Sequence, residues 1–256
     1  MSQRFDDRVV LVTGATSGIG EACTNLFADR GASVLLTGRD QAKGDAMVAA
    51  LLARGNKAAF LAGDVRDSGF CETAVATAVA EFGRLDVLIN SAGIWRAAST
   101  VDTTDEMWHA TIETNVSGTF FMARAALRQM LKQGSGNIVN IASDWGLLGG
   151  QEAAAYCASK GAVVLLTKAM ALDHARDNIR INVLCPTDTD TPMMDNDYIA
   201  RGIDLAAGKA SSSAANPMGR MATANDVAEA ACFLASSAAG FITGVSLPID
   251  GGATAD

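Results

Sequence analysis

Tyr156 and Lys160 are the residues of this 256-residue chain whose types and spacing are best suited to proton transfer. Residues four positions apart lie on one face of a helix, so the spacing brings an ammonium group beside a phenol. A phenol alone titrates near pH ~10, and a neighbouring cation lowers such a pKa by roughly 1–3 units. The pair therefore suits a general acid or base, although on its own it is more typical of an ordinary amphipathic helix.

A glycine-rich turn near the N-terminus is typical of a phosphate-binding site. Segment 8–13 predicts a buried strand and runs directly into Gly14-Ala-Thr-Ser-Gly18-Ile-Gly20, which is followed by helical spacing over 21–30. Glycines let the backbone approach a pyrophosphate, and a helix N-terminus offers free N–H groups and the positive end of its dipole. The spacing differs from the common G-x-G-x-x-G pattern, but the flanking strand and helix favour a nucleotide site over a turn without a ligand.

Further motifs follow one another along the whole chain. They are Thr13 to Gly20, Gly63-Asp64-Val65, Asn90-Ser-Ala-Gly93, Asn115-Val-Ser-Gly, Ser143, Tyr156-x-x-x-Lys160, Pro186 to Thr191 and Asp250-Gly-Gly. In type and order these motifs resemble the single-domain members of the short-chain dehydrogenase/reductase family, and the resemblance covers essentially the entire sequence. Ser91 stands where the family usually has a second Asn, and Thr187 stands where it usually has Gly. Any one motif could arise by chance, whereas the ordered set is a strong signal.

The resemblance implies four catalytic residues. Tyr156 would give a proton to a carbonyl oxygen during reduction, or accept one during alcohol oxidation, and Lys160 would lower its pKa and bind the nicotinamide ribose. Ser143 would hydrogen-bond the same substrate oxygen, which then has two convergent donors. Asn115 would hold a water that relays protons past the lysine, a role compatible with an Asn that relieves a helix kink.

The resemblance also implies a nicotinamide dinucleotide cofactor, and Arg39 favours NADP over NAD. Relatives that prefer NAD end the second strand with a carboxylate that bonds the ribose 2′-hydroxyl, but this chain has Gly38 there. Arg39 can instead clamp a 2′-phosphate. Ser17, where many NADP-preferring relatives have a second basic residue, and the nearby Asp40 speak against NADP, so NAD stays open. The residues expected at the cofactor are Gly14, Thr16, Ser17, Gly18, Ile19, Gly20, Arg39, Asp64, Val65, Asn90, Ala92, Gly93, Tyr156, Lys160, Pro186, Thr189 and Thr191.

The expected substrate is a small polar or cyclic secondary alcohol or ketone. Positions that line the pocket in relatives are occupied here by Ser143, Trp95, Trp145, Gln151, Tyr156 and Thr187, together with Arg96, Asp144, Asp188 and Met193. Two other functions stay open. A 3-oxoacyl-thioester reductase of lipid synthesis would need a basic patch for an acidic carrier protein, which a net charge of −8 does not support. A nucleotide-sensing regulator would not need all four catalytic residues.

Composition and charge indicate a cytoplasmic protein with no nucleic-acid or membrane partner. A chain with 49% hydrophobic and 19% charged residues suits a parallel sheet that is buried on both faces. The negative net charge argues against nucleic acid and anionic membranes. No uncharged apolar run appears long enough to span a bilayer, and the N-terminus lacks the apolar core of a signal peptide. The five cysteines have neither metal-ligand nor disulfide spacing, so no metal site is expected.

Strand-like and helix-like apolar segments alternate along the chain. This alternation predicts a Rossmann-like, doubly wound α/β fold with a parallel sheet of about seven strands, helices on both faces and a single domain over residues 1–256. Residues 193–224 break the alternation, and by resemblance they form a long, mobile substrate lid, with a disordered insertion as the alternative. The long helices and the C-terminal tail imply a homotetramer. The expected strands are 8–13, 33–37, 57–62, 85–90, 137–142, 179–185 and 246–249, with long helices near 104–132 and 153–176.

Overall fold

A seven-stranded parallel sheet forms the centre of the computed structural model, which describes residues 3–255. The strand order is β3-β2-β1-β4-β5-β6-β9, and each strand lies within two residues of its expected bounds. β1 is paired with both β2 and β4, so the chain crosses over between these neighbours and leaves a crevice at their carboxyl ends. The strands are β1 (Val9–Thr13), β2 (Ser33–Gly38), β3 (Lys57–Ala62), β4 (Val87–Asn90), β5 (Gly136–Ile141), β6 (Ile179–Pro186) and β9 (Ser246–Ile249).

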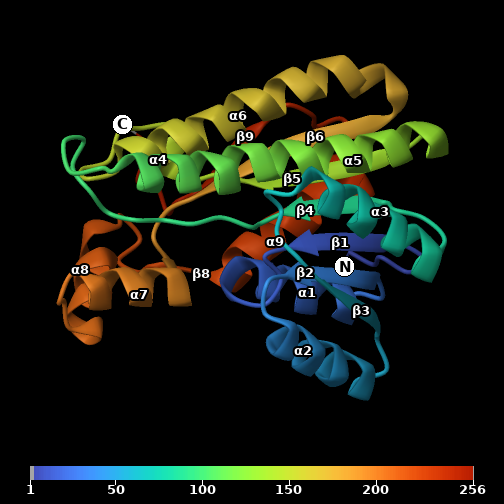
Figure 1. Cartoon of the computed structure of the whole chain (residues 1–256), viewed down its shortest axis with the longest axis horizontal. Coiled ribbons are helices and arrows are strands. Elements are labelled where there is room, and N and C mark those ends of the chain that lie inside the picture. Colours follow the sequence, from blue (N-terminus) through green and yellow to red (C-terminus); the bar gives the residue numbers. More distant parts are fainter. Residues whose placement is uncertain (1–2, 256) are drawn as a thin grey trace.

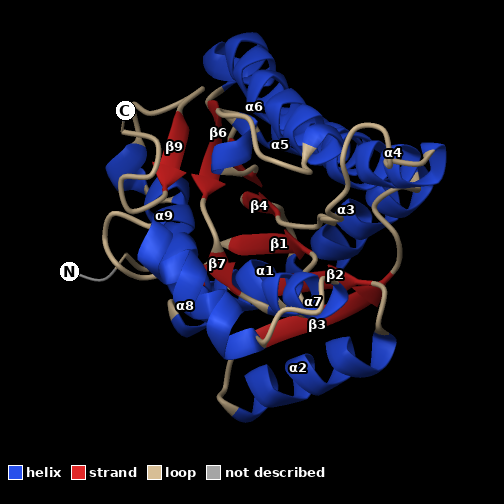
Figure 2. Ribbon diagram, turned by 90° about the vertical axis from the view of Figure 1, so that its left-hand side faces the viewer, coloured by secondary structure: helices blue, strands red, loops and turns tan. Residues whose placement is uncertain are grey.

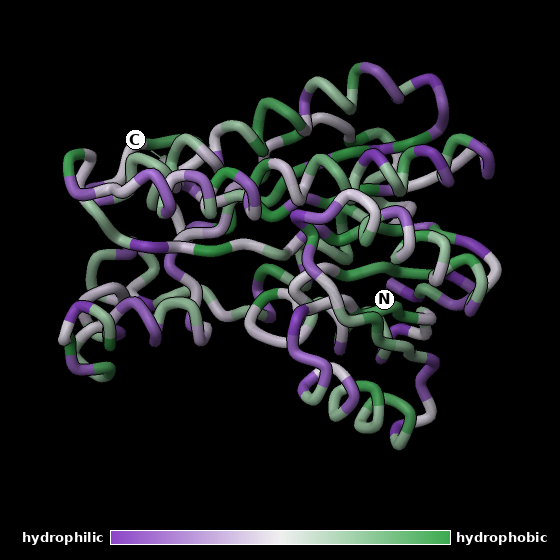
Figure 3. The backbone as a smooth tube through the Cα atoms, in the orientation of Figure 1, coloured by the Kyte–Doolittle hydropathy of each residue, from purple (hydrophilic) through white to green (hydrophobic). Residues whose placement is uncertain are grey.

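Helices cover both faces of the sheet, as Figures 1 and 2 show. Successive strand residues point to opposite faces, so Val10 and Val12 enter one core while Val9 and Leu11 enter the other. In Figure 3 much of the backbone along the central strands has the green of hydrophobic residues. The expected doubly wound fold is therefore confirmed. One face is covered by α1 (Gly18–Asp29), α2 (Gln41–Ala53) and α9 (Ala224–Ala235), and the other by α3 (Ser68–Phe82), α5 (Gly118–Gln133) and α6 (Ala154–His174).

The long helix expected before β5 is interrupted by a wider turn. α4 (Asp105–Ile112) passes into a π-helical segment, Glu113–Ser117, before α5 begins. Asn115 lies at the middle of this segment and is buried. Its side chain accepts a hydrogen bond from the Ile94 N–H at 2.8 Å and donates to the Ile94 carbonyl at 3.0 Å and to Ser159 Oγ at 3.0 Å. Because π-helical turns are rare and occur frequently at functional sites, this interruption indicates a functional role for the segment that contains Asn115.

Two helices, α7 (Pro192–Ala200) and α8 (Leu205–Ala215), occupy most of the segment that was expected to be a long loop. Pro192 takes the first helical position of α7, and the Asp204 carboxylate accepts the Ala207 N–H at 3.0 Å to start α8. The sequence of α8 is rich in Ala and Ser and has no apolar period, which is why its pattern predicted a loop.

The α7–α8 pair lies at one end of the molecule, beyond the end of β1 (Figure 1). A two-stranded parallel sheet of β7 (Thr189–Asp190) and β8 (Ala222–Thr223) joins its two ends. The pair is therefore anchored close to the carboxyl end of β6.

α6 is the one helix within residues 3–255 that is long and apolar enough, by length and composition alone, to cross a bilayer. The helix carries Lys160 and Lys168, so it is not an uncharged apolar run of the kind that the sequence was expected to lack. The helix packs against β6, however, and buries Val163 and Met170 in the protein core. A buried core helix meets the same criteria, so this finding does not indicate a membrane span.

Candidate active site

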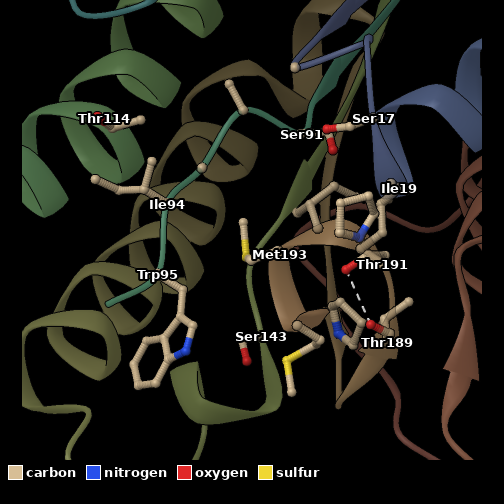
Figure 4. Close-up of a pocket in the computed structure, with 18 of the residues that line it drawn as sticks. Ser17, Ile19, Ser91, Ile94, Trp95, Thr114, Ser143, Thr189, Thr191 and Met193 are labelled. Atoms are coloured by element: carbon tan, nitrogen blue, oxygen red, sulfur yellow. Dashed lines mark hydrogen bonds between the residues drawn. The ribbon is translucent and has the colours of Figure 1, made fainter. Parts of the chain in front are cut away.

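A cleft of about 410 Å³ lies at the carboxyl ends of the strands. Its walls come from the glycine turn after β1, from the segments that follow β2, β4, β5 and β6, and from α7 and α8. Figure 4 shows Ser17 and Ser91 toward one end of it, and Trp95 and Ser143 toward the other. This is the crevice at which open α/β sheets bind their ligands.

Most of the residues expected in the site line this cleft. Asp144, Asp188 and Met193 line it too. Segments far apart in the sequence therefore meet in one place, as the ordered motifs predicted. The lining includes Gly14, Thr16, Ser17, Gly18, Ile19, Arg39, Asp64, Val65, Ala92, Gly93, Trp95, Ser143, Trp145, Tyr156, Lys160, Pro186, Thr187, Thr189 and Thr191.

Five of the expected residues do not line the cleft. Arg96 and Gln151 are exposed to solvent outside the cleft. The other three, Gly20, Asn90 and Asn115, lie behind the lining. The structure thus places these three where they can shape the cleft walls but not form its surface.

The turn after β1 has the close backbone packing that a pyrophosphate site needs. A β-carbon on Gly20 would lie 2.2 Å from the Gly14 carbonyl oxygen, and one on Gly14, whose φ is +62°, would lie 2.9 Å from the Ala92 Cα. Ser17 precedes α1 without its side chain capping the helix, which leaves the first N–H groups available to a ligand. The chain is therefore suited, here, to hold the diphosphate of a dinucleotide.

Tyr156 and Lys160 lie together, but their pKa values do not follow the simple expectation. The Lys160 ammonium is 5.6 Å from the centre of the Tyr156 ring and donates to the Ile141 carbonyl at 2.9 Å. Burial lowers the pKa of Lys160 to about 8. Burial also raises the pKa of Tyr156, with a hydrogen bond to Ser143 acting in the opposite direction and the charge of Asp144 adding to the rise. The expected lowering by the lysine is not found: desolvation has the largest effect on the pKa of the phenol, and Lys160 is not among the groups that shift it.

Ser143 is fixed at the end of β5 by its neighbours. Its hydroxyl donates to Asp144 Oδ1 at 2.8 Å and accepts the Trp145 N–H at 3.2 Å. The side chain is buried but reaches the cleft surface next to Tyr156. The two hydroxyls that were expected to share a substrate oxygen therefore lie in one wall of the cleft.

Gly93 lies beside both Asn115 and Lys160. A β-carbon at Gly93 would lie 3.4 Å from Asn115 Oδ1 and 3.5 Å from Lys160 Nζ. The π-helical turn and α6 thus bring Asn115 and Lys160 to the same glycine.

Three aromatic rings form a continuous surface, the aromatic wall (Trp95, Trp145 and Tyr156). The ring centres of Trp95 lie 5.3 Å from Trp145 and 5.0 Å from Tyr156, in edge-to-face packing. Gly150 fits against the indole of Trp145, since a β-carbon there would lie 2.6 Å from the ring. The wall gives the cleft a rigid apolar side next to the phenol.

Residues of α7 and α8 that sequence reasoning missed also line the cleft. The Tyr198 hydroxyl and Ser212 Oγ lie 2.8 Å apart, and Ser212 donates to Asp188 Oδ2 at 2.6 Å. Arg201 reaches Glu152 at 3.1 Å. No motif marks these positions, and the weak pattern of α8 hides them. The remaining missed residues include Ile94, Thr114, Met194 and Asp197.

The structure gives Asn90 a role inside the sheet. Its amide donates to Asn140 Oδ1 at 2.9 Å and to the Thr119 carbonyl at 3.3 Å, and Asn140 in turn donates to Thr167 at 2.8 Å. We expect Asn90→Ala to lower the free energy of unfolding by about 1–3 kcal/mol, because buried acceptors lose their donor. Urea unfolding and nucleotide titration of the variant measure both effects. A large loss of nucleotide affinity at unchanged stability would show instead that Asn90 acts on the cofactor.

Comparison with known proteins places the chain in a family. A family model described as Enoyl-(Acyl carrier protein) reductase matches residues 14–254. The chain is 39% identical to the cis-4-hydroxycyclohexanecarboxylate dehydrogenase of Sinomonas cyclohexanicum over 100% of both chains. It is 42% identical to the meso-2,3-butanediol dehydrogenase of Serratia marcescens over 98% of this chain and 96% of that relative. The crystal structure of levodione reductase is similar with a TM-score of 0.94 at 33% identity, over 98% of this chain and 99% of the other.

The chain therefore belongs to the short-chain dehydrogenase/reductase family. It is an oxidoreductase that acts on CH–OH groups and interconverts a secondary alcohol and a ketone. Dehydrogenases of this family use the nicotinamide dinucleotides NAD or NADP. The family, the fold and the reaction class predicted from the sequence are confirmed.

Proposed function

We propose that this enzyme acts on small polar or cyclic secondary alcohols and the corresponding ketones, with Tyr156 as general acid and base. The main support is the placement of Tyr156 and Ser143 beside the aromatic wall in a single cleft. Two relatives bear names that state such substrates, a hydroxylated cyclohexane and a butanediol. A small ring or short diol would place its carbon atoms against the indoles and its reacting oxygen between the two hydroxyls.

A bound nicotinamide ring supplies the hydride transfer. The glycine turn and the start of α1 hold the diphosphate of that cofactor. Tyr156 gives its proton to the carbonyl oxygen during reduction and takes a proton from the alcohol during oxidation, while Ser143 hydrogen-bonds the same oxygen. Because burial keeps the pKa of Tyr156 high, the phenol stays protonated near neutral pH and is ready to donate.

Lys160 and Asn115 assist the transfer of the proton that Tyr156 exchanges with the substrate. Lys160 would contact the ribose of the bound cofactor, and both Lys160 and Asn115 lie close to Gly93. We assign to this part of the site a water that would carry protons away from the lysine. Asn115→Leu removes the amide and its hydrogen bonds to Ile94 and Ser159, and we expect it to slow turnover more than it weakens nucleotide binding.

The cofactor we propose is NADP. Gly38 ends β2 without a carboxylate, and Arg39 lines the cleft beside it. Asp40, which was expected to offset Arg39, instead accepts the Lys43 N–H at 3.1 Å as the cap of α2 and lies 3.9 Å from the Lys43 ammonium. No ion pair joins Asp40 to Arg39 among the described residues, which supports a role for the arginine as the partner of a 2′-phosphate.

Arg39→Ser is expected to weaken NADPH binding about tenfold or more and to leave NADH binding nearly unchanged, since only NADPH loses a charge-assisted contact. Parallel titrations that follow nicotinamide fluorescence measure both dissociation constants. Lys43→Ser, which removes a cation outside the cleft, is the matched control. Tighter binding of NADH by the unaltered protein, or an equal loss for both nucleotides in the variant, would refute the assignment.

We further propose that the α7–α8 pair acts as a substrate lid and that the enzyme is a cytoplasmic homotetramer. The lid is supported by the residues that both helices contribute to the cleft.

The tetramer is supported by large apolar side chains exposed on α5 and α6, among them Leu131, Leu165 and Leu172. Sedimentation velocity of the purified protein tests the oligomeric state.

A 3-oxoacyl-thioester reductase is the weaker assignment. The printed description of the family model mentions an acyl carrier protein. An acidic carrier needs basic residues at the cleft entrance, whereas Asp144 and Asp188 line this cleft and the chain has a net charge of −8. The dehydrogenase names of the similar relatives also favour an enzyme over a nucleotide-sensing regulator.

A further inference from the structure

Two carboxylates line the cleft close to Tyr156 without a cation beside them. Asp144 and Asp188 both line it, and the charge of each raises the pKa of the phenol. Within residues 3–255, neither lies within 4 Å of a Lys, Arg or His nitrogen. Arg201, which directly follows α7 and lines this cleft, is paired with Glu152 at 3.1 Å and with Asp197 at 3.6 Å.

Asp144 is held from the sheet side of the cleft. It is 9% exposed, and its Oδ1 accepts the Ser143 hydroxyl and the Trp145 N–H, each at 2.8 Å. Burial raises the pKa of this carboxyl, hydrogen bonds from Ser143 and Thr187 act against the rise, and the charge of Asp188 adds to it. Asp188 thus lies near enough for its charge to act on the Asp144 carboxyl.

Asp188 is held from the side of α7 and α8. Ser212 of α8 donates to its Oδ2 at 2.6 Å, and the hydroxyl of Tyr198 in α7 lies 2.8 Å from the same serine oxygen. The Asp188 carboxylate is therefore held in the cleft lining by its hydrogen bond to Ser212.

We propose that Asp144 and Asp188 select substrates that carry a second hydrogen-bond donor, a hydroxyl or an ammonium group, next to the reacting carbinol, and that they reject substrates with a carboxylate. This inference rests on the proposed function and narrows its substrate class. A neutral monoalcohol adds no donor for the carboxylates, so when the cleft loses its water Asp144 keeps only its bonds to the protein and Asp188 keeps its bond to Ser212. A second donor replaces that water, and a hydrogen bond to an ionised acceptor is stronger than one between neutral groups.

The aromatic wall and the carboxylates act on different parts of the same molecule. The indoles of Trp95 and Trp145 cover the carbon skeleton, while the acidic side of the cleft binds the second substituent. A hydroxy acid would bring a third negative charge to this side and would be repelled. The inference therefore separates this enzyme from its relative that is named for a hydroxycyclohexanecarboxylate, in spite of 39% identity.

The test compares two matched series of alcohols under saturating nucleotide. The ring series is cyclohexanol, cyclohexane-1,2-diol, 2-aminocyclohexanol and 4-hydroxycyclohexanecarboxylate, and the open-chain series is butan-2-ol, butane-2,3-diol, 3-aminobutan-2-ol and 3-hydroxybutyrate. In at least one series, kcat/KM for the diol or the amino alcohol should exceed that for the monoalcohol by about tenfold or more, and the hydroxy acid should be slowest. The better of the diol and the amino alcohol identifies the second donor as hydroxyl or ammonium.

Charge-removing variants then connect this preference to the two carboxylates. Asp188→Asn and Asp144→Asn should each cut the preference for the donor-bearing substrate about fivefold to tenfold and raise kcat/KM for the hydroxy acid relative to the monoalcohol. Asp173→Asn, on the exposed side of α6, removes the same charge elsewhere and should leave the ratios unchanged. Because the readout is a ratio between substrates, a variant that only loosens α7 and α8 or disturbs Ser143 lowers all values together and does not imitate the effect.

The outcomes separate the inference from the proposed function. Equal turnover of monoalcohols and diols, a preference for the hydroxy acid, or ratios that neither variant changes would overturn the inference while the alcohol dehydrogenase assignment stands. If no alcohol of either series reacts with NADP or NAD, and no corresponding ketone reacts with NADPH or NADH, although the nucleotide binds, the proposed function and the inference both fail.

Discussion

Tyr156→Phe is expected to lower kcat by about 10²–10⁴-fold, the usual worth of a positioned proton donor. The change removes one oxygen and keeps the ring, so the aromatic contact with Trp95 at 5.0 Å between ring centres is retained. The nucleotide should still bind, because the glycine turn and the start of α1 lie in another part of the cleft. Initial rates with the best substrate and a fluorescence titration with NADPH measure the two quantities.

The second tyrosine of the chain provides the matched control. Tyr198→Phe removes a hydroxyl that contacts Ser212 rather than the reacting oxygen, so its effect on kcat should stay within about tenfold. Turnover by Tyr156→Phe at a similar level would show that the phenol is not the proton donor. A variant that binds no nucleotide would assign Tyr156 a structural role instead.

Lys160→Met is expected to lower kcat/KM by about 10²-fold, since it removes the cation that orients the cofactor and assists the phenol. The same change should alter the pH dependence of nucleotide binding. The pKa of Lys160 is depressed to about 8, so the ammonium is present below pH 8 and is lost above it. An anionic dinucleotide should therefore bind more weakly as the pH rises through 8, and this change should disappear in the variant.

Nucleotide titrations between pH 6.5 and 9.5, with the unaltered protein and the variant side by side, check this prediction. An unchanged slope in Lys160→Met would mean that another group titrates, and an unchanged kcat/KM would remove the lysine from the mechanism. Lys168→Met, on the same helix away from the cleft, tests whether loss of any α6 cation has these effects.

The sequence predicted the sheet and the cleft because both depend on strong local signals. Buried parallel strands are short continuous apolar runs, and their ends were found within two residues. The glycine turn and the Tyr156–Lys160 pair are also recognised from neighbouring positions in the sequence, and residues of both line the cleft. Residues that act through local geometry can be located without a structure.

Features that depend on tertiary packing could not be predicted in this way. The spacing of Tyr156 and Lys160 predicts that they lie close together but does not predict how deeply they are buried. The predicted lowering of the Tyr156 pKa is therefore wrong for this structure, in which burial raises it. Asn90 belongs to a motif, yet only the neighbouring strand reveals that it pairs with Asn140. Ser212 belongs to no recognisable motif, and only the position of α8 in the folded protein shows that this residue lines the cleft.

The central claim is that the carbinol hydrogen of a secondary alcohol passes to the nicotinamide in this cleft with Tyr156 taking the proton. The most direct measurement uses butane-2,3-diol and cyclohexane-1,2-diol that carry deuterium on the carbinol carbons, with NADP or NAD, and mass spectrometry of the reduced nucleotide. We predict that the nucleotide gains deuterium with the unaltered enzyme and gains it about 10²–10⁴-fold more slowly with Tyr156→Phe. A nucleotide that binds but acquires no deuterium from any alcohol tested, or that acquires it equally in the variant, would contradict the account.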